Sequence, residues 1–318
     1  MLRFRVTVAA LVAAVLILPF SISAAPAGLA YDSIIKFAMN ADSSAQQPGD
    51  FSADFAAAAA VQGPDLGGGN GLFNQIHQAE ARAKSMQQLM QTGFAERHYV
   101  AGTKERTDNL SMQTATIIDC AARTITRLDL RHKTYKTDSM DQSSSPGGEG
   151  GASGAPAHDD GTRVAVTVSN TALGSRDVGG QPSSGYRSDM TITETSRSGE
   201  SRTQKGNMIG YYSSFANPAS SCSRMGAPSG PNGQMGSAMM GNFAQLMRAL
   251  TSSGMDKRFT ISQSGPPLPL GKLAMFSAAA FTNGQGNGMT FVTERGNVRA
   301  ISASDPVFAI PPDFTLQE

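Results

Sequence analysis

The sequence predicts a mainly β (α+β) fold, in which a strongly curved antiparallel sheet, or half β-barrel, carries two amphipathic helices on its concave face. Three observations predict it. Segments rich in Thr, Ile, Tyr and Arg recur from residue 95 onward, with turn residues about every 8 to 12 positions. Two other segments have the apolar period of a helix. Gly and Pro supply 34 and 16 of the 318 residues, and only 16% are charged, which is typical of strands joined by long loops.

The N-terminal region has the organisation of a secretory signal peptide. Arg3 and Arg5 precede an apolar run over 6–20, and the small-residue segment SISAAPA follows at 21–27. The run is shorter than the roughly 20 residues that a membrane-spanning helix needs, although a retained N-terminal anchor is the alternative. We therefore expect cleavage near Ala27, localisation to the periplasm or outside the cell, and no stable membrane span once residues 1–27 are removed.

Residues 28–318 are expected to form one domain. Its first strand is predicted at 31–40, and an alanine-rich turn of helix is expected within the following loop region. The composition predicts flexible insertions near 41–71, 141–161 and 217–242, which are rich in Gly, Ser, Pro or Met. The glycines at 67–71 give only a weak indication of phosphate binding, because no strong strand precedes them.

The clearest predicted helix covers 72–90, and Gly93 provides a stop signal after it. One apolar stripe runs along it, formed by Leu72, Ile76, Ala79, Ala83, Met86 and Met90. Packing against a sheet of the same protein is the simpler interpretation of the stripe, and binding of a partner or a membrane is the alternative. A second, short helix is predicted at 243–253, with Phe243, Leu246, Met247 and Leu250 on one face.

Strands dominate the remainder of the chain. A meander of short antiparallel strands is predicted over 95–137, with turns at 120–122 and 131–133. Further strands are predicted over 163–213 and 258–301, and no internal repeat of fixed period is expected. The net charge of +1 gives no indication of nucleic-acid binding.

Two cysteines, Cys120 and Cys222, would enter an oxidising compartment together. A disulfide between them is the expected outcome, and two free thiols or a functional cysteine are the alternatives.

The sequence contains few candidates for catalytic or metal chemistry. It lacks GxSxG, HExxH and P-loop motifs, so we expect no enzymatic activity and no cofactor. The four histidines have no metal-ligand spacing and are expected at the surface, although His98 and His132 could meet in the fold. Met235, Met239 and Met240 are weak candidates for a Cu(I) site, because thioethers are soft ligands, but packing is the simpler interpretation of these residues.

Two stretches of the chain resemble a known group of proteins. These are YVAGTKERTDN…TATIIDCAARTITRLDLRHKTYKT in the first meander and DPVFAIPPDF at the end, and ALGSRDVGGQPSSGYRSDMTITET adds a middle segment. They are similar to the exported bacterial half-barrel group, which contains the outer-membrane lipoprotein-sorting carriers (LolA-like) and related uncharacterised envelope families. The resemblance implies a curved sheet with helices on the concave face and an apolar cavity that holds acyl chains.

The expected function is therefore a non-enzymatic envelope protein that binds a lipid, an acyl chain or a lipidated partner. The candidate groove residues come from the two helix faces: Leu72, Ile76, Met86, Met90, Phe243, Leu246, Met247 and Leu250. An interaction or stress-sensing module that uses its flexible loops is one alternative, and a Met-rich Cu(I)-binding protein is another. An unrecognised hydrolase would require His, Asp and Ser side chains to meet in one pocket.

Overall fold

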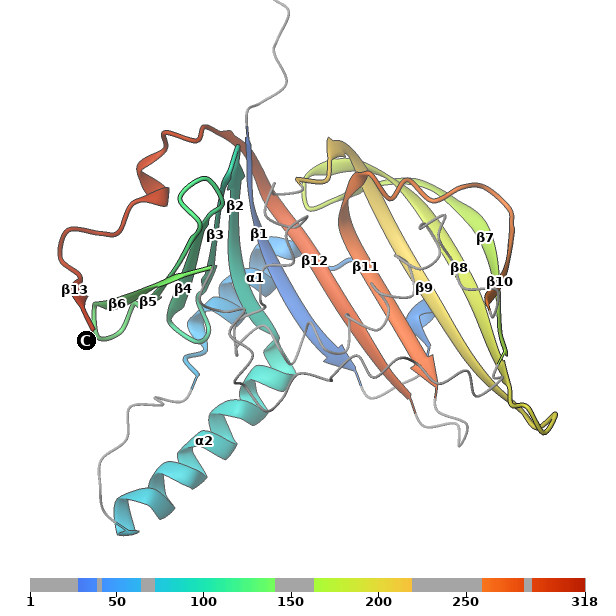
Figure 1. Cartoon of the computed structure of the whole chain (residues 1–318), viewed down its shortest axis with the longest axis horizontal. Coiled ribbons are helices and arrows are strands. Elements are labelled where there is room, and N and C mark those ends of the chain that lie inside the picture. The colour runs from blue at the N-terminus through green and yellow to red at the C-terminus, as the bar shows by residue number, and fades with distance from the viewer. Residues whose placement is uncertain are drawn as a thin grey trace, which may run out of the picture.

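The computed structural model describes residues 28–38, 42–63, 72–140, 163–218, 259–282 and 288–317. They form one large, open, curved sheet of 13 strands with two α-helices (Figure 1). The strands run in the order β10-β7-β8-β9-β11-β12-β1-β2-β3-β4-β5-β6-β13. All neighbouring pairs are antiparallel except β10–β7 and β13–β6, so the prediction of a mainly β, largely antiparallel sheet is confirmed.

The strand bounds are as follows: β1 Gly28–Ala38, β2 Phe94–Ala101, β3 Lys104–Asn109, β4 Thr114–Asp119, β5 Thr124–Asp129, β6 Thr134–Ser139, β7 Arg163–Val178, β8 Gln181–Thr195, β9 Ser201–Ala216, β10 Phe259–Ser264, β11 Lys272–Thr282, β12 Gly288–Ile301 and β13 Thr315–Leu316. The helices are α1 Phe51–Ala60 and α2 Leu72–Thr92, with 3-10 turns η1 Ser43–Ala45 and η4 Pro306–Phe308. The predicted helix over 243–253 lies outside the described residues.

The predicted meander forms β2 to β6, and its regularity exceeds the sequence-based expectation. Strands β3 to β6 begin at residues 104, 114, 124 and 134, which is a ten-residue period. The connecting turns each place one non-glycine residue at positive φ, namely Gln113 (55°), Arg123 (54°) and Lys133 (52°). In two of these turns an aspartate accepts backbone N–H bonds, as Asp119 does from Ala121 (3.0 Å) and Ala122 (3.1 Å). The prediction that no fixed-period repeat exists is therefore wrong for this segment. The repeat is short and degenerate: Thr114, Thr124 and Thr134 begin three of the strands, and Asn109, Asp119 and Asp129 end the strands before them.

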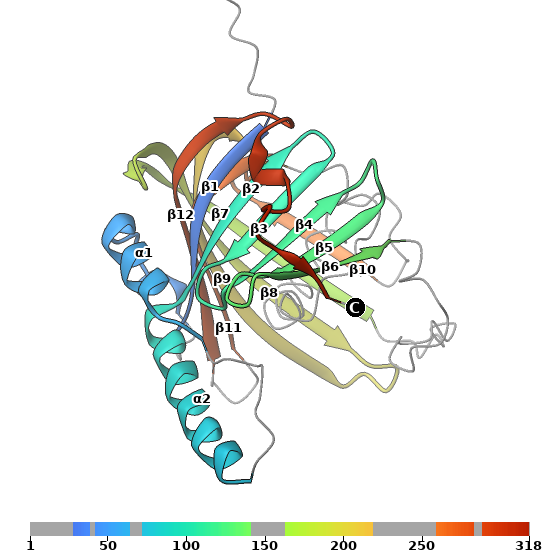
Figure 2. The ribbon, with the colours of Figure 1, turned by 90° about the vertical axis from the view of Figure 1, so that its left-hand side faces the viewer.

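Helix α1 covers the convex side of the sheet (Figures 1 and 2). Asp50 caps its N-terminus by accepting from the backbone N–H groups of Ser52 (3.1 Å) and Ala53 (3.2 Å). Phe51, Phe55 and Ala58 then pack with Ile34 of β1 and Ala95 of β2 to form a buried cluster. The alanine run was expected to form only a helical turn, but these two phenylalanines supply the apolar face that stabilises a full helix.

Helix α2 confirms the predicted helix, and Gly93 at φ 92° ends it by donating its backbone N–H to the Leu89 carbonyl (2.8 Å). Its position differs from the prediction, since α2 does not lie across the concave face. Instead, only its C-terminal end reaches α1 and β1, and the rest projects away from the sheet (Figure 2). The buried side chain of this end is Leu89, which lies outside the predicted stripe.

Candidate functional site

The two faces of the sheet are assigned from β1. Ile34 points toward α1 and therefore lies on the convex face. Because successive side chains of a strand alternate between faces, Ser33, Ile35 and Phe37 point to the concave face. Cα pairing extends this assignment across the sheet, since Phe37 pairs with Phe291, and a row of partners continues through Ala279, Met208, Ser188 and Asn170.

Three phenylalanines form an aromatic cluster on the concave face, where β1, β2 and β12 lie side by side. The Phe37 ring contacts the Phe291 ring edge-on at a centroid distance of 5.3 Å and the Phe94 ring at 6.0 Å. Three and four strands away from β12, the same face carries the buried apolar side chains Met190 of β8 and Val166 of β7. The traced row is therefore apolar from β1 to β9, through Phe37, Phe291, Ala279 and Met208, and polar at Ser188 and Asn170 on β8 and β7.

A polar cluster lies further along the same face and consists of Tyr31, Ser33, Glu96, His98, Thr107 and Arg295. The His98 Nε2 atom lies 3.0 Å from the Ser33 hydroxyl oxygen and 3.2 Å from a Glu96 carboxylate oxygen. Its Nδ1 atom lies 3.4 Å from the Thr107 hydroxyl, and the Tyr31 ring stacks on the imidazole at a centroid distance of 4.9 Å. Strands β1, β2, β3 and β12 each contribute to the cluster, because their registers bring these residues to neighbouring positions.

The Ser33, His98 and Glu96 side chains do not have the geometry of a catalytic triad. In a triad, one imidazole nitrogen faces the nucleophile and the other faces the carboxylate. Here both the Ser33 hydroxyl and the Glu96 carboxylate approach Nε2, and Ser33 is only 1% exposed. This arrangement links three strands through hydrogen bonds but does not prepare the serine for attack.

Arg295 is the cation of the polar cluster. Its guanidinium lies 5.7 Å above the Tyr31 ring centroid, and its Nη1 donates to the Ala274 carbonyl at 2.6 Å. Burial raises the pKa of the Tyr31 hydroxyl, and the nearby Arg295 charge acts to lower it. The same two effects act on the Tyr212 hydroxyl, whose pKa is also raised by burial. Within the described chain, the Arg295 Nε and the Thr293 hydroxyl are buried without a hydrogen-bond partner.

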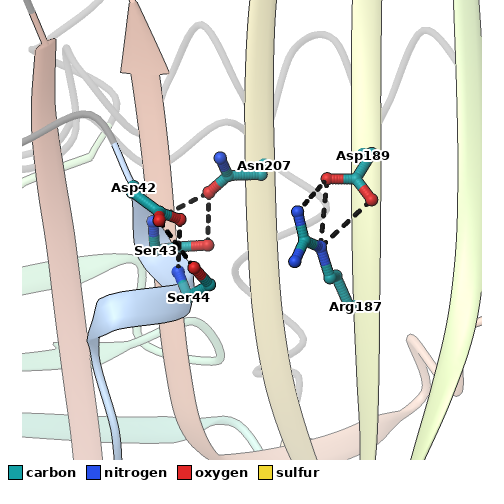
Figure 3. A network of polar contacts seen from close by, with 6 residues as sticks. All are labelled: Asp42, Ser43, Ser44, Arg187, Asp189 and Asn207. Carbon is teal, nitrogen blue, oxygen red and sulfur yellow. Dashed lines mark hydrogen bonds and ion pairs between the residues drawn. The ribbon is translucent and has the colours of Figure 1, made fainter.

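A pocket of about 350 Å³ lies on the convex side, between the start of α1 and the turn that joins β7 to β8. Its charged lining residues are already engaged, since Arg176 donates to Gln47 (3.1 Å) and Asp50 caps α1. Nearby, η1 is held on β9 by bonds from the Ser43 N–H (2.8 Å) and hydroxyl to Asn207, while Arg187 pairs with Asp189 on β8 (Figure 3). These convex-side contacts satisfy one another and attach η1 to the sheet.

The structure describes the surroundings of two of the predicted groove residues, Met86 and Met90. Leu72 and Ile76 belong to α2, and the side chains of Met86 and Met90 are 39% and 44% exposed on it. Phe243, Leu246, Met247 and Leu250 lie outside the described residues, as do Met235, Met239 and Met240 of the weak Cu(I) hypothesis. The structure therefore does not bring Met86 or Met90 to the apolar concave face.

Cys120 is buried and is not a free thiol. Its predicted partner, Cys222, lies outside the described residues, so the Cys120–Cys222 pairing stays a prediction. In the segments that the structure describes, no group of three or more His, Cys, Asp or Glu side chains could hold a metal ion. None of the helices in these segments is long and apolar enough to cross a membrane.

The two histidines that could have met are held apart by different partners. His132 lies at an exposed turn, where its Nδ1 contacts Asp129 at 2.8 Å, whereas His98 belongs to the polar cluster. His98 was expected at the surface, but its side chain is only 20% exposed. The alternation of Glu96 and His98 along β2 shows that they share a face, but only the register of β1 and β12 brings Ser33 and Arg295 beside them.

Comparison with known proteins gives no relative from which a function could be transferred. No family model matches the chain, and no curated protein or solved structure matches it.

Proposed function

We propose that this protein is a non-enzymatic, exported binding protein of half-barrel architecture that holds an acyl chain, as a free lipid or on a lipidated partner. The observation that carries the proposal is the composition of the concave face, where the aromatic cluster and the polar cluster lie on neighbouring parts of β1, β2 and β12. An amphiphile has the same division into an apolar chain and a polar end. The signal-peptide pattern and the resemblance to the LolA-like half-barrel group support the same proposal.

The energetics favour a chain over a small polar ligand. Each methylene group removed from water contributes about 0.8 kcal/mol, so a chain of a dozen methylenes gains roughly 10 kcal/mol before the cost of immobilisation is subtracted. The gain requires an apolar surface, and the concave face carries an apolar row from Phe37 on β1 through Phe291 and Ala279 to Met208 on β9. The absence of triad geometry at His98 favours binding over hydrolysis.

Native mass spectrometry of the gently purified mature chain tests this proposal. We expect a bound species with the mass of a lipid at about one per protein, which is released on denaturation. Protein that stays empty after expression in its native envelope, and that also fails to take up added long-chain lipid, would contradict the proposal.

A pair of variants tests whether the lipid binds at the aromatic cluster. Phe37→Ser removes the central ring of the aromatic cluster and should lower lipid occupancy, because both ring contacts are lost. Leu316→Ser is the matched control, since Leu316 is 61% exposed on β13 at the far edge of the sheet. Equal loss of lipid in both variants would indicate that the aromatic cluster is not the binding surface.

A further inference from the structure

One hydrogen-bond donor of Arg295 has no partner in the described chain. Its Nη1 is committed to the Ala274 carbonyl, whereas its Nε is buried and has no partner. Nε and Nη2 lie side by side on one edge of the guanidinium plane, and that edge has the spacing to bind a carboxylate with two parallel hydrogen bonds. A buried donor on a cation is costly unless an acceptor satisfies it. The Tyr31 hydroxyl is a polar neighbour of this guanidinium, since a hydrogen bond with Arg295 acts to lower its pKa against the effect of burial.

The carboxylates around Arg295 are engaged elsewhere. Glu294, its neighbour in sequence, points to the convex face, where it pairs with Lys36 at 3.1 Å. Glu96 contacts His98 at 3.2 Å and accepts from Asn109 at 3.2 Å. Within the described residues no carboxylate forms an ion pair with Arg295, so the compensating anion is not supplied by these parts of the chain.

The neighbouring side chains define what else the anion would meet. The Thr293 hydroxyl, which is also buried without a partner, lies two residues from Arg295 on the same face of β12. Phe291 of the aromatic cluster lies two residues further along this face. With a rise of about 3.4 Å per residue, this face of β12 carries a guanidinium, a hydroxyl and a phenyl ring within roughly 14 Å along the strand.

We infer that Arg295 binds the carboxylate of a single-chain fatty acid through its guanidinium, with Nε as one donor, and that the hydrocarbon chain runs along β12 past Thr293 to Phe291 and Phe37. This inference rests on the proposed function and assigns the chemical class of the ligand and its orientation. Because a guanidinium holds its N–H donors in one plane, it favours a planar anion, and a neutral head group would leave the Nε donor without an anion.

Binding of matched twelve-carbon amphiphiles to the full mature chain tests the inference. Dodecanoate, dodecanol, dodecyl phosphate and dodecyltrimethylammonium share a chain and differ in the head group, and acetate and inorganic phosphate serve as chain-free anions. At pH 7.5 we expect dodecanoate to bind about 10- to 100-fold more tightly than dodecanol, as charge-assisted hydrogen bonds predict. We expect the cationic amphiphile to bind most weakly.

Variants at Arg295 assign the preference to this side chain. Arg295→Gln should bring the affinity for dodecanoate down to that for dodecanol, while the affinity for dodecanol itself changes little. Arg295→Lys keeps the charge and should retain part of the preference. Arg299→Gln is the matched control, because Arg299 also lies over a tyrosine ring, 5.6 Å from the Tyr99 centroid, but is exposed on the same strand. Circular dichroism and thermal unfolding check that each variant is folded.

The outcomes separate this inference from the function on which it rests. Equal affinity of the wild-type chain for dodecanoate and dodecanol would overturn the role of Arg295 but leave chain binding intact. Tighter binding of dodecyl phosphate than of dodecanoate would overturn the carboxylate assignment. Binding of acetate or phosphate without any amphiphile would overturn both proposals, and so would the absence of binding by every compound.

Discussion

At the scale of single residues, two ion pairs in this protein differ in what surrounds them. Arg106 and Asp108 are both 8% exposed, with an Nε–Oδ1 distance of 2.5 Å, and Arg106 also donates to the Val307 carbonyl at 2.7 Å. The pair therefore connects β3 to the C-terminal segment that crosses the convex face. Arg187 and Asp189 form an ion pair of similar chemistry on β8, but their side chains are 39% and 49% exposed.

Burial should make the first pair far more sensitive to truncation than the second. Asp108→Ala leaves the Arg106 charge buried and unpaired, so we expect a loss of about 3–5 kcal/mol in the free energy of unfolding. Asp189→Ala should cost less than about 1 kcal/mol because solvent screens that pair. Urea unfolding measures the free energy of unfolding of both variants. Similar losses in the two would contradict the conclusion that burial makes the Arg106–Asp108 pair the more sensitive one. The double variant Arg106→Met/Asp108→Leu should be more stable than Asp108→Ala, since it removes both charges.

Asp129 adds a pH-dependent contribution at the turn between β5 and β6. Burial raises the pKa of this carboxyl, but hydrogen bonds from His132 and Arg131 outweigh that effect and leave the pKa lowered. A lowered pKa in the folded state stabilises the fold above the unfolded value near 4, and this contribution is lost as the pH falls through the folded pKa. Asp129→Asn keeps the turn acceptor but not the charge. We expect the difference in urea midpoint between wild type and variant to be present at pH 5 and to shrink below about pH 4; an unchanged difference at pH 3 would contradict this.

At the scale of elements, the sequence predicted which segments form helices and strands better than it predicted where those elements lie in the fold. The meander and helix α2 could be recognised because periodicity and stop signals are local properties. Three features of the fold were not predicted, because each depends on how separate segments of the chain compare or meet. The ten-residue repeat has only two recurring positions, a Thr at the start of a strand and an Asn or Asp at its end. Helix α1 depends on two phenylalanines meeting Ile34 and Ala95, and the polar cluster depends on strand registers. The sequence therefore predicted a site on helix faces, whereas the aromatic and polar clusters among the described side chains lie on strands.

The repeated turns make a stability prediction at Lys133, which adopts a φ of 52°. This left-handed conformation is strained for residues with a Cβ and most strained for β-branched ones. We expect Lys133→Val to lower the free energy of unfolding by at least about 1 kcal/mol, and Lys133→Gly to leave it unchanged or raise it by up to about 1 kcal/mol. Lys136→Val provides the control within β6, where φ is not positive and a β-branched residue is suited to the strand. Equal effects of valine at 133 and 136 would argue against the turn geometry.

At the scale of the whole molecule, one covalent link is predicted to connect the meander with a distant part of the chain. Cys120 is buried at the turn between β4 and β5 and is not a free thiol. A bond to Cys222 closes a loop of roughly 100 residues, which corresponds to about 4–5 kcal/mol in the chain-entropy description. Peptide mapping without reduction should recover one linked pair, and a Cys120→Ser/Cys222→Ser variant should unfold at lower urea concentration. Recovery of two alkylated free cysteines from the unreduced, unfolded protein would refute the pairing.

The sheet also joins the two ends of the described chain at its centre. Strand β1 lies between β2, which follows it closely in sequence, and β12, which begins at Gly288. The ribosome therefore completes almost the entire polypeptide before β1 can find its second neighbour. Until then the nascent chain consists of two unfinished half-sheets with open strand edges at Gly28–Ala38 and at β11. Premature termination before residue 288 would leave both edges permanently unpaired, so truncated products of this gene should be prone to aggregation and degradation even though most of their strands are present.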